Sequence, residues 1–370
     1  MSTGKSERLF RVLLFAAAGI CALAIFEIPA LLRIVDYRGV FGEPFQDDLE
    51  LGFRHLPHAH SKGRASGGLV STLHRVPRAD MKEYRWDLRY DQNGFRNEVD
   101  LQKADIAVIG DSFVEGSTIP FPQLMTSRLA HLQGKVTANL GLNMYGPHQE
   151  LIVLKRYGLP LEPQTVLWVF AEGSDLHDIL HDRQVRVHPP APGAAIFERS
   201  FTKQVIRAFM PLLVSRPDGR SRSGIVQTSG GKRLTEYFLR PIGPLDQDLL
   251  SAIDETTRVL GEAYAFCRAH GVRLVFVFAP DKFRVFHDFC QFPEYSECRN
   301  WTVPDLPARL ERGVASISPD IGFLDLTPAL VNVVKSGILP YFTDDVHWSP
   351  EGHEAAAEAI NQYLVDHPSR

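Results

Sequence analysis

The chain has 370 residues, a formal net charge of -4, and an ordinary globular balance of 23% charged and 44% apolar residues. This length accommodates one large domain, or one domain with appendages. The slightly acidic balance excludes a dedicated nucleic-acid binder, which would carry a strongly basic face. The cysteines lack metal-ligand spacing, and no motif calls for a metal or a cofactor.

An apolar stretch near the N-terminus has the length of a membrane span. Residues 12–32 contain Glu27 as their only charge and number about 20, the length that a helix needs to cross a bilayer. Three basic residues precede the stretch: Lys5, Arg8 and Arg11. Basic residues before a span favour a cytoplasmic N-terminus, so we expect everything after Arg33 to be exported.

Residues 1–33 are therefore predicted to anchor the protein in the bacterial inner membrane as a single pass. The C-terminal domain would then lie in the periplasm or outside the cell. A cleaved signal peptide is the alternative, because Ala22, Leu23 and Ala24 have the small-x-small form of a cleavage site. Both interpretations export the bulk of the chain.

Residues 34–100 are rich in Gly, His, Pro and Arg and show little periodicity. We interpret them as a linker and an irregular lead-in to the domain. His55, His58 and His60 are metal-ligating residue types, but no acidic partner lies nearby, and solvated loop histidines are the preferred interpretation.

Strand and helix patterns alternate from residue 101 onward. Strand-like runs are expected at 106–109, 135–142, 165–170, 272–279 and 321–326, and helical patterns at 122–132, 147–157, 249–270, 304–314 and 350–365. Such alternation predicts right-handed βαβ units. The predicted fold is α/β: a three-layer α/β/α domain over 101–370, flavodoxin-like, with a central, mainly parallel five-stranded sheet.

Two insertions interrupt this alternation, near 182–244 and 281–303. The first contains eight basic residues: Lys203, Arg207, Arg216, Arg220, Arg222, Lys232, Arg233 and Arg240. It is either a solvated insertion or a surface that contacts an anionic polymer or lipid headgroups. The second contains Cys290 and Cys298, whose spacing permits a disulfide but equally two free thiols.

The first core strand ends in Gly110, Asp111 and Ser112, at the carboxyl edge where open α/β sheets place their ligand sites. We predict that Ser112 is a nucleophile. A serine hydroxyl is weakly nucleophilic at its free pKa, so this prediction requires a base, an orienting acid and oxyanion donors elsewhere in the chain.

The last strand-to-helix turn supplies the candidate base and acid. His347 follows Asp344 by three residues, just before a helix that Ser349 and Pro350 would start. A histidine there can accept the serine proton, while the acid holds the ring in the required tautomer. Asp345 is a rival for the acid.

Oxyanion donors are expected from the turns after the second and third strands. Gly141 ends the second strand, and a glycine there exposes its backbone N–H above the sheet. Gly173, Ser174 and Asp175 follow the third strand, and Ser174 is the candidate third donor. Asp111 and Asp175 are predicted neighbours of the site.

These four blocks, GDSF, NLG, GSD and DxxH, resemble those of the SGNH (GDSL-like) hydrolase superfamily, in the family's order and over about residues 104–364. The resemblance implies Ser112 as nucleophile and, with Gly141, as an oxyanion donor, His347 as base and Asp344 as acid. Ser174 stands where the family has asparagine, which implies a weaker oxyanion hole.

The wider pattern around YGPHQEL, WVFAEGSDL and DVHWSPEGH is similar to exported SGNH-like proteins of bacterial polysaccharide O-acetylation. The predicted function is an exported serine esterase or O-acyltransferase that acts on an acyl, here acetyl, ester of a cell-envelope glycan. The predicted partners are this substrate and the inner membrane, with no nucleic acid. A catalytically silent domain that binds a glycan or an assembly partner is the alternative, and hydrolysis of a lipid acyl chain is a third possibility.

Overall fold

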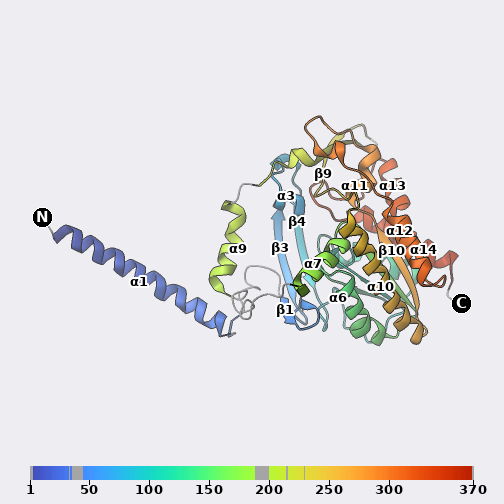
Figure 1. Ribbon diagram of the computed structural model, residues 1–370, viewed down its shortest axis with the longest axis horizontal. Coiled ribbons are helices and arrows are strands. Elements are labelled where there is room, and N and C mark those ends of the chain that lie inside the picture. The colour runs from blue at the N-terminus through green and yellow to red at the C-terminus, as the bar shows by residue number, and fades with distance from the viewer. Residues whose placement is uncertain are drawn as a thin grey trace. The chain divides into compact units, whose positions relative to one another are not determined.

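The computed structural model describes residues 3–32, 34–35, 45–187, 200–213, 216–228 and 230–368 (Figure 1). The chain forms two compact units, Met1–Phe45 with Val187–Ser215 and Gln46–Arg186 with Arg216–Arg370. Residues 36–44 of the predicted linker and 188–199 of the first predicted insertion lie outside the described residues.

The smaller unit pairs two helices, α1 (Thr3–Leu31) and α9 (Phe201–Leu213). Within α1, Phe10–Leu31 is long and apolar enough to cross a membrane, as a membrane anchor or a signal sequence would be. Glu27, the only charge in the predicted span, accepts hydrogen bonds from Thr202 N at 2.9 Å and Thr202 Oγ1 at 3.0 Å. The carboxylate thus satisfies an N–H group in the first turn of α9.

The larger unit is built on a parallel five-stranded sheet in the order β11-β10-β7-β5-β6. The strands are β5 (Ile106–Gly110), β6 (Thr137–Gly141), β7 (Thr165–Ala171), β10 (Arg273–Ala279) and β11 (Gly322–Asp325). The central strand β7 is buried along its whole length, as a strand covered on both faces must be. The predicted five-stranded α/β/α fold is confirmed.

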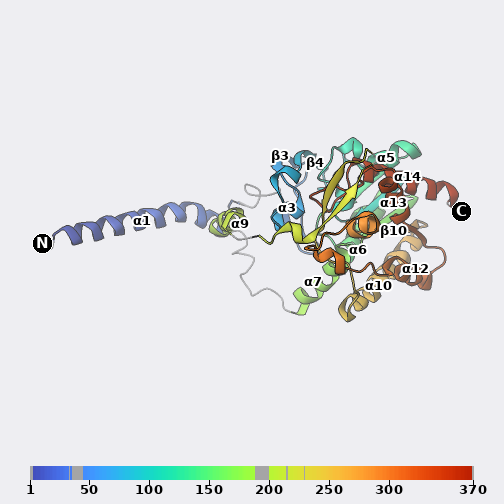
Figure 2. The same ribbon diagram turned by 90° about the horizontal axis from the view of Figure 1, so that it is seen from above.

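Helices cover both faces of this sheet (Figure 2). The helices of the larger unit are α3 (Leu69–Leu73), α4 (Ser112–Glu115), α5 (Met125–Gln133), α6 (Pro147–Val153), α7 (Asp175–Val187), α10 (Gln247–Ala269), α11 (Lys282–Phe286), α12 (Leu306–Ile317), α13 (Thr327–Lys335) and α14 (Pro350–Asp366). One layer packs α5 and α13 against α14, and the other packs α6 and α12 against α10. This layering leaves the carboxyl edge of the sheet for the strand-end turns.

The segment before the sheet is more ordered than the sequence predicts. Four strands lie in it: β1 (Phe45–Asp48), β2 (Gly52–His55), β3 (His60–Ser66) and β4 (Glu83–Arg89). The strands β3 and β4 form an antiparallel pair, and Tyr84 and Leu88 of β4 are buried. The expected irregular lead-in is therefore wrong for these residues: β4 alternates charged and apolar residues, which is the pattern of a half-buried strand, whereas β3 has no apolar face.

Part of the first predicted insertion also packs into the larger unit. Residues 223–237 form an antiparallel hairpin of β8 (Ser223–Gln227) and β9 (Arg233–Tyr237). Tyr237 N, at the end of β9, donates to Thr343 O at 3.1 Å. In the second predicted insertion, Cys290 and Cys298 are free thiols, so the disulfide alternative is not formed.

Candidate active site

Ser112 occupies the turn that follows β5. Asp111 caps α4 by accepting a hydrogen bond from Phe113 N at 2.9 Å, and Ser112 is the first residue of that helix. Gly116 ends the helix with a left-handed φ of 62°, where an added Cβ would lie 2.2 Å from Leu124 Cδ2. A one-turn helix with caps at both ends thus presents Ser112 at the carboxyl edge of the sheet.

The closing loop, residues 341–349, brings His347 to the same edge. Tyr341 bridges to Trp348, and Phe342 N donates to His347 O at 3.2 Å, so the loop folds back on itself. Ser349 then caps α14, as predicted, by accepting a hydrogen bond from Gly352 N. These local bonds fix where the loop ends and the helix begins.

A hydrogen-bonded chain of three side chains joins the two elements. The hydroxyl of Ser112 lies 2.8 Å from His347 Nε2, and His347 Nδ1 lies 2.5 Å from Asp345 Oδ1. Asp345 Oδ1 also accepts from His347 N at 3.0 Å, and its Oδ2 accepts from Leu69 N at 2.6 Å. The carboxylate thus holds the imidazole with Nδ1 as donor and Nε2 facing the serine.

Asp344, the predicted acid, does not contact His347. Its carboxylate is fully buried against the segment before the sheet. It accepts hydrogen bonds from four groups: Gly68 N at 3.0 Å, Ser71 Oγ at 2.7 Å, Lys82 N at 3.3 Å and Tyr84 Oη at 2.9 Å. The Asp344–His347 pairing is therefore corrected to Asp345–His347, because these four donors occupy the carboxylate of Asp344 and Asp345 alone reaches the imidazole.

The charge distribution supports a basic imidazole. Burial would lower the pKa of His347, but the charge of Asp345 and its hydrogen bond outweigh burial, and the pKa is raised. Burial would raise the pKa of Asp345, but the charge and hydrogen bond of His347 lower it to about 2. Asp345 is therefore ionised at neutral pH, as an orienting acid must be.

Two of the three predicted oxyanion donors already donate hydrogen bonds to other protein groups. Gly141 N already donates to Asn139 Oδ1 at 3.1 Å, and Ser174 Oγ donates to Asp111 Oδ2 at 2.8 Å. Ser112 N, in contrast, donates to no acceptor in the described part of the chain. The predicted set of three is thus reduced to one open donor, because neighbouring buried oxygens capture the other two.

Carboxyl groups gather behind Ser112. Asp175 is fully buried and accepts from Ala171 N at 2.9 Å. Burial, followed by the charges of Glu150 and Asp111, raises the pKa of Asp175 well above its usual range. Burial likewise raises the pKa of Asp111. The predicted neighbours Asp111 and Asp175 therefore both lie in a cluster that disfavours further negative charge.

Three other histidines have structural partners. His353 on α14 is buried and accepts a hydrogen bond from Met125 N at 3.2 Å through Nδ1. His60 contacts Asp87 on β4, whereas His55 is fully buried against Glu115, so the expectation of a solvated loop histidine is wrong for His55. In the described ranges no group of three or more His, Cys, Asp or Glu side chains could hold a metal ion.

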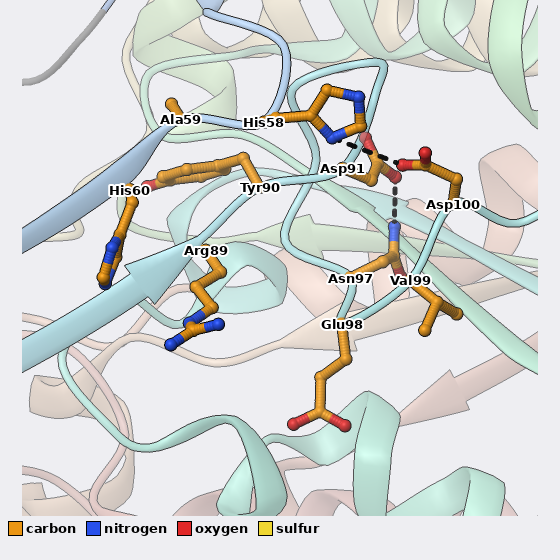
Figure 3. Close-up of a pocket in the computed structure, with 10 residues that line it drawn as sticks. All are labelled: His58, Ala59, His60, Arg89, Tyr90, Asp91, Asn97, Glu98, Val99 and Asp100. Atoms are coloured by element: carbon orange, nitrogen blue, oxygen red, sulfur yellow. Dashed lines mark hydrogen bonds and ion pairs between the residues drawn. The ribbon is translucent and has the colours of Figure 1, made fainter.

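A separate pocket of about 410 Å³ lies where β3 and β4 meet the loop at 91–100 (Figure 3). Asn97 crosses it to donate to Asp91 Oδ2 at 2.8 Å, and His58 Nδ1 lies 3.7 Å from Asp100 Oδ1. Its ten lining residues include none of the predicted site residues. The pocket is therefore distinct from the site at Ser112.

Residues 245–369 match the family model described as the SGNH hydrolase-like domain of the acetyltransferase AlgX. This C-terminal third of the chain is similar to an SGNH hydrolase-like domain. The matched residues contain Asp345 and His347, whereas Ser112 precedes them. No curated protein sequence matches the chain.

Solved structures of GDSL and esterase proteins are similar to this chain at low identity. A GDSL-like lipase from Bacteroides thetaiotaomicron is 13% identical, with 70% of this chain and 87% of that chain covered and a TM-score of 0.35. An acetyl xylan esterase from Butyrivibrio proteoclasticus is 10% identical, with 77% and 73% covered and a TM-score of 0.35. Likeness at this level does not bear on substrate or activity.

Sequence reasoning missed the residues that hold the closing loop. Asp345 stands next to Asp344 in the sequence, and spacing alone cannot decide which of the two carboxylates contacts His347. Lys282, three residues after the end of β10, is buried beneath the loop and bonds to its carbonyl groups. A lysine so close to the end of a buried strand was the sequence signal for a cation at the carboxyl edge of the sheet.

Proposed function

We propose that the protein is an exported SGNH-type serine esterase or O-acyltransferase that acts on an acetyl ester of a cell-envelope glycan. The observation that carries the proposal is the chain of contacts from Ser112 through His347 to Asp345, at 2.8 Å and 2.5 Å. The match to a domain described for an acetyltransferase favours acetyl as the group transferred. The apolar helix at the N-terminus favours a site of action at the cell envelope.

In this mechanism Ser112 Oγ attacks the ester carbonyl carbon while His347 Nε2 takes the hydroxyl proton. The N–H of Ser112 stabilises the developing oxyanion. When the ester C–O bond breaks, His347 returns the proton to the leaving oxygen, and the acyl group remains on Ser112. Water or a sugar hydroxyl then attacks the acyl-enzyme, with His347 again taking and returning the proton.

A fluorophosphonate probe tests the nucleophile, because it modifies activated serines. We expect the full-length protein to be labelled and the Ser112→Ala variant not to be labelled. Incubation with an acetyl-ester donor and candidate glycans then separates the acceptors: free acetate indicates hydrolysis, and an acetylated glycan indicates transfer. Absence of labelling in folded wild-type protein would overturn the enzyme proposal.

A second candidate is a catalytically silent domain that binds a glycan or an assembly partner. The observation that favours it is the loss of open oxyanion donors, since Gly141 N and Ser174 Oγ already bond to neighbouring oxygens. Removing one such donor costs about 2.7 to 4 kcal/mol of barrier in a serine hydrolase. Folded protein that binds acetylated glycan without labelling or turnover would favour this candidate.

A further inference from the structure

Lys282 lies beneath the closing loop at the carboxyl end of β10. It is the first residue of α11, its side chain is 1% exposed, and Asp281 caps the helix before it. An ammonium buried this deeply is costly unless its hydrogens all find acceptors. The partners of Lys282 therefore show what the lysine does.

Backbone carbonyl groups supply most of those partners. Lys282 Nζ lies within hydrogen-bonding distance of four carbonyl oxygens: Phe342 O at 2.8 Å, Thr343 O at 2.7 Å, Tyr237 O at 3.0 Å and Asp345 O at 3.3 Å. Three of the four belong to the closing loop, and one of these is the carbonyl of the acid that holds His347. The ammonium thus fixes the backbone on both sides of Asp344.

The β8–β9 hairpin completes this arrangement. Glu236, which is fully buried on β9, places Oε2 2.8 Å from Lys282 Nζ and accepts from Thr343 Oγ1 through Oε1 at 3.3 Å. The next residue, Tyr237, donates its N–H to Thr343 O. The hairpin, α11 and the closing loop therefore meet at one buried ion pair.

We propose that the Lys282–Glu236 pair is a positioning device, which holds the closing loop so that Asp345 can orient His347 toward Ser112. This inference rests on the proposed function. Lys282 does not touch the reacting atoms, so it is a positioning residue. It acts by fixing the loop carbonyls, and a displacement of about 1 Å at such a loop can cost about 100-fold in rate.

The test replaces both charges together, because removing one alone leaves the other buried and unpaired. In the full-length Lys282→Met/Glu236→Met variant we expect kcat for p-nitrophenyl acetate to fall about 10- to 100-fold with KM within about twofold. The imidazole pKa of His347, followed by NMR in protein with labelled histidine, should fall because the contact with Asp345 loosens. The Lys282→Gln/Glu236→Gln variant, which retains polar side chains of similar size, is measured in parallel. It tests the positioning role if the Lys282→Met/Glu236→Met variant does not fold.

The matched control is the ion pair of Arg183 and Glu255, which joins α7 to α10 at 2.5 Å away from the closing loop. Arg183→Met/Glu255→Met should leave kcat and the pKa of His347 unchanged. The inference would be overturned if kcat and the pKa of His347 were unchanged in a folded Lys282/Glu236 variant. It would also be overturned if both quantities fell equally in the Arg183/Glu255 control. If wild-type protein neither turns over nor labels, the proposed function fails, and the pKa of His347 alone decides the positioning role.

Discussion

The two halves of the candidate site are held in different ways. Ser112 begins a one-turn helix that Asp111 caps and Gly116 ends, and remote side chains also bond to this helix. His55 and Tyr90 bond to the carboxylate of Glu115. The loop that carries His347 depends on distant residues, because it is bound to Gly68 and Leu69 on one side and to Lys282 on the other. The two halves therefore differ in local structure: Ser112 lies in a capped helical turn, whereas His347 lies in an irregular loop that remote segments hold in place.

This difference teaches which positions control the site. The caps at Asp111 and Gly116 define where the Ser112 helix begins and ends over a few residues. The closing loop needs the segment at 68–84, the β8–β9 hairpin and α11 to be in place together. We therefore expect substitutions in these three segments to displace His347 and Asp345, and the predictions below run from the largest expected effect to the smallest.

The sharpest test exchanges the acid in contact with His347. Asp345→Asn replaces the charge that holds the imidazole tautomer, so we expect kcat for an acetyl ester to fall about 10³- to 10⁴-fold. Asp344→Asn should retain far more activity per folded molecule, because Asp344 does not reach His347. Equal losses in the two variants would mean that the distinction between the adjacent aspartates is wrong.

The pH profile tests the same contact. The imidazole must be neutral to accept the serine proton, and its pKa is raised because Asp345 outweighs burial; Asp111 and Glu115 act in the same direction. We expect kcat/KM of the wild type to rise with pH through a pKa above the ordinary histidine value of about 6.5. In Asp345→Asn the rise of the residual kcat/KM should move to lower pH, because burial then lowers the pKa of His347 without the opposing charge of Asp345.

Asp344 is expected to matter for stability. Its carboxylate accepts four hydrogen bonds in a fully buried position, and a carboxamide would turn an N–H₂ group toward some of those donors. Asp344→Asn should lower the free energy of unfolding by about 3 kcal/mol. Urea denaturation measures the loss, and the buried Asp111→Asn is a comparison near Ser112. A loss below about 1 kcal/mol would contradict the anchoring role.

Gly68 tests the approach of the segment before the sheet. A Cβ at Gly68 would lie 2.4 Å from Asp345 Oδ2 and 2.8 Å from Asp344 O. Gly68→Ala should therefore displace the closing loop, lower kcat about tenfold, and cost about 1 to 3 kcal/mol of stability. Gly261→Ala on α10 is the control, since its nearest neighbour would be 3.9 Å away, and it should be neutral or stabilising.

The smallest effect is expected at Ser174. Its hydroxyl already donates to Asp111, so Ser174→Ala should lower kcat less than about tenfold, instead of the 10²- to 10³-fold that an oxyanion donor contributes. Gly141 N is engaged in the same way, although a backbone group cannot be removed by such a substitution. A loss near 10³-fold would show that the hydroxyl turns toward the substrate during turnover.

Much of the fold could be predicted because its signals are local. Apolar runs predicted the buried strands β5, β7 and β10, and Ser349 with Pro350 predicted the start of α14. Of the strands before residue 100, β4 could have been predicted, because it alternates charged and apolar residues over seven positions. Its partner β3 could not, because neither of its faces is apolar.

The sequence by itself determined the sheet, its carboxyl edge and the placing of Ser112 and His347 on that edge, because strand patterns and turn residues act over a few positions. Only the tertiary structure decided which aspartate faces His347, which N–H groups stay open, and that Lys282 and Glu236 meet beneath the loop. These outcomes depend on packing between segments far apart in the chain. A side chain that turns to one side of a tight loop or the other does so according to partners that no local pattern encodes.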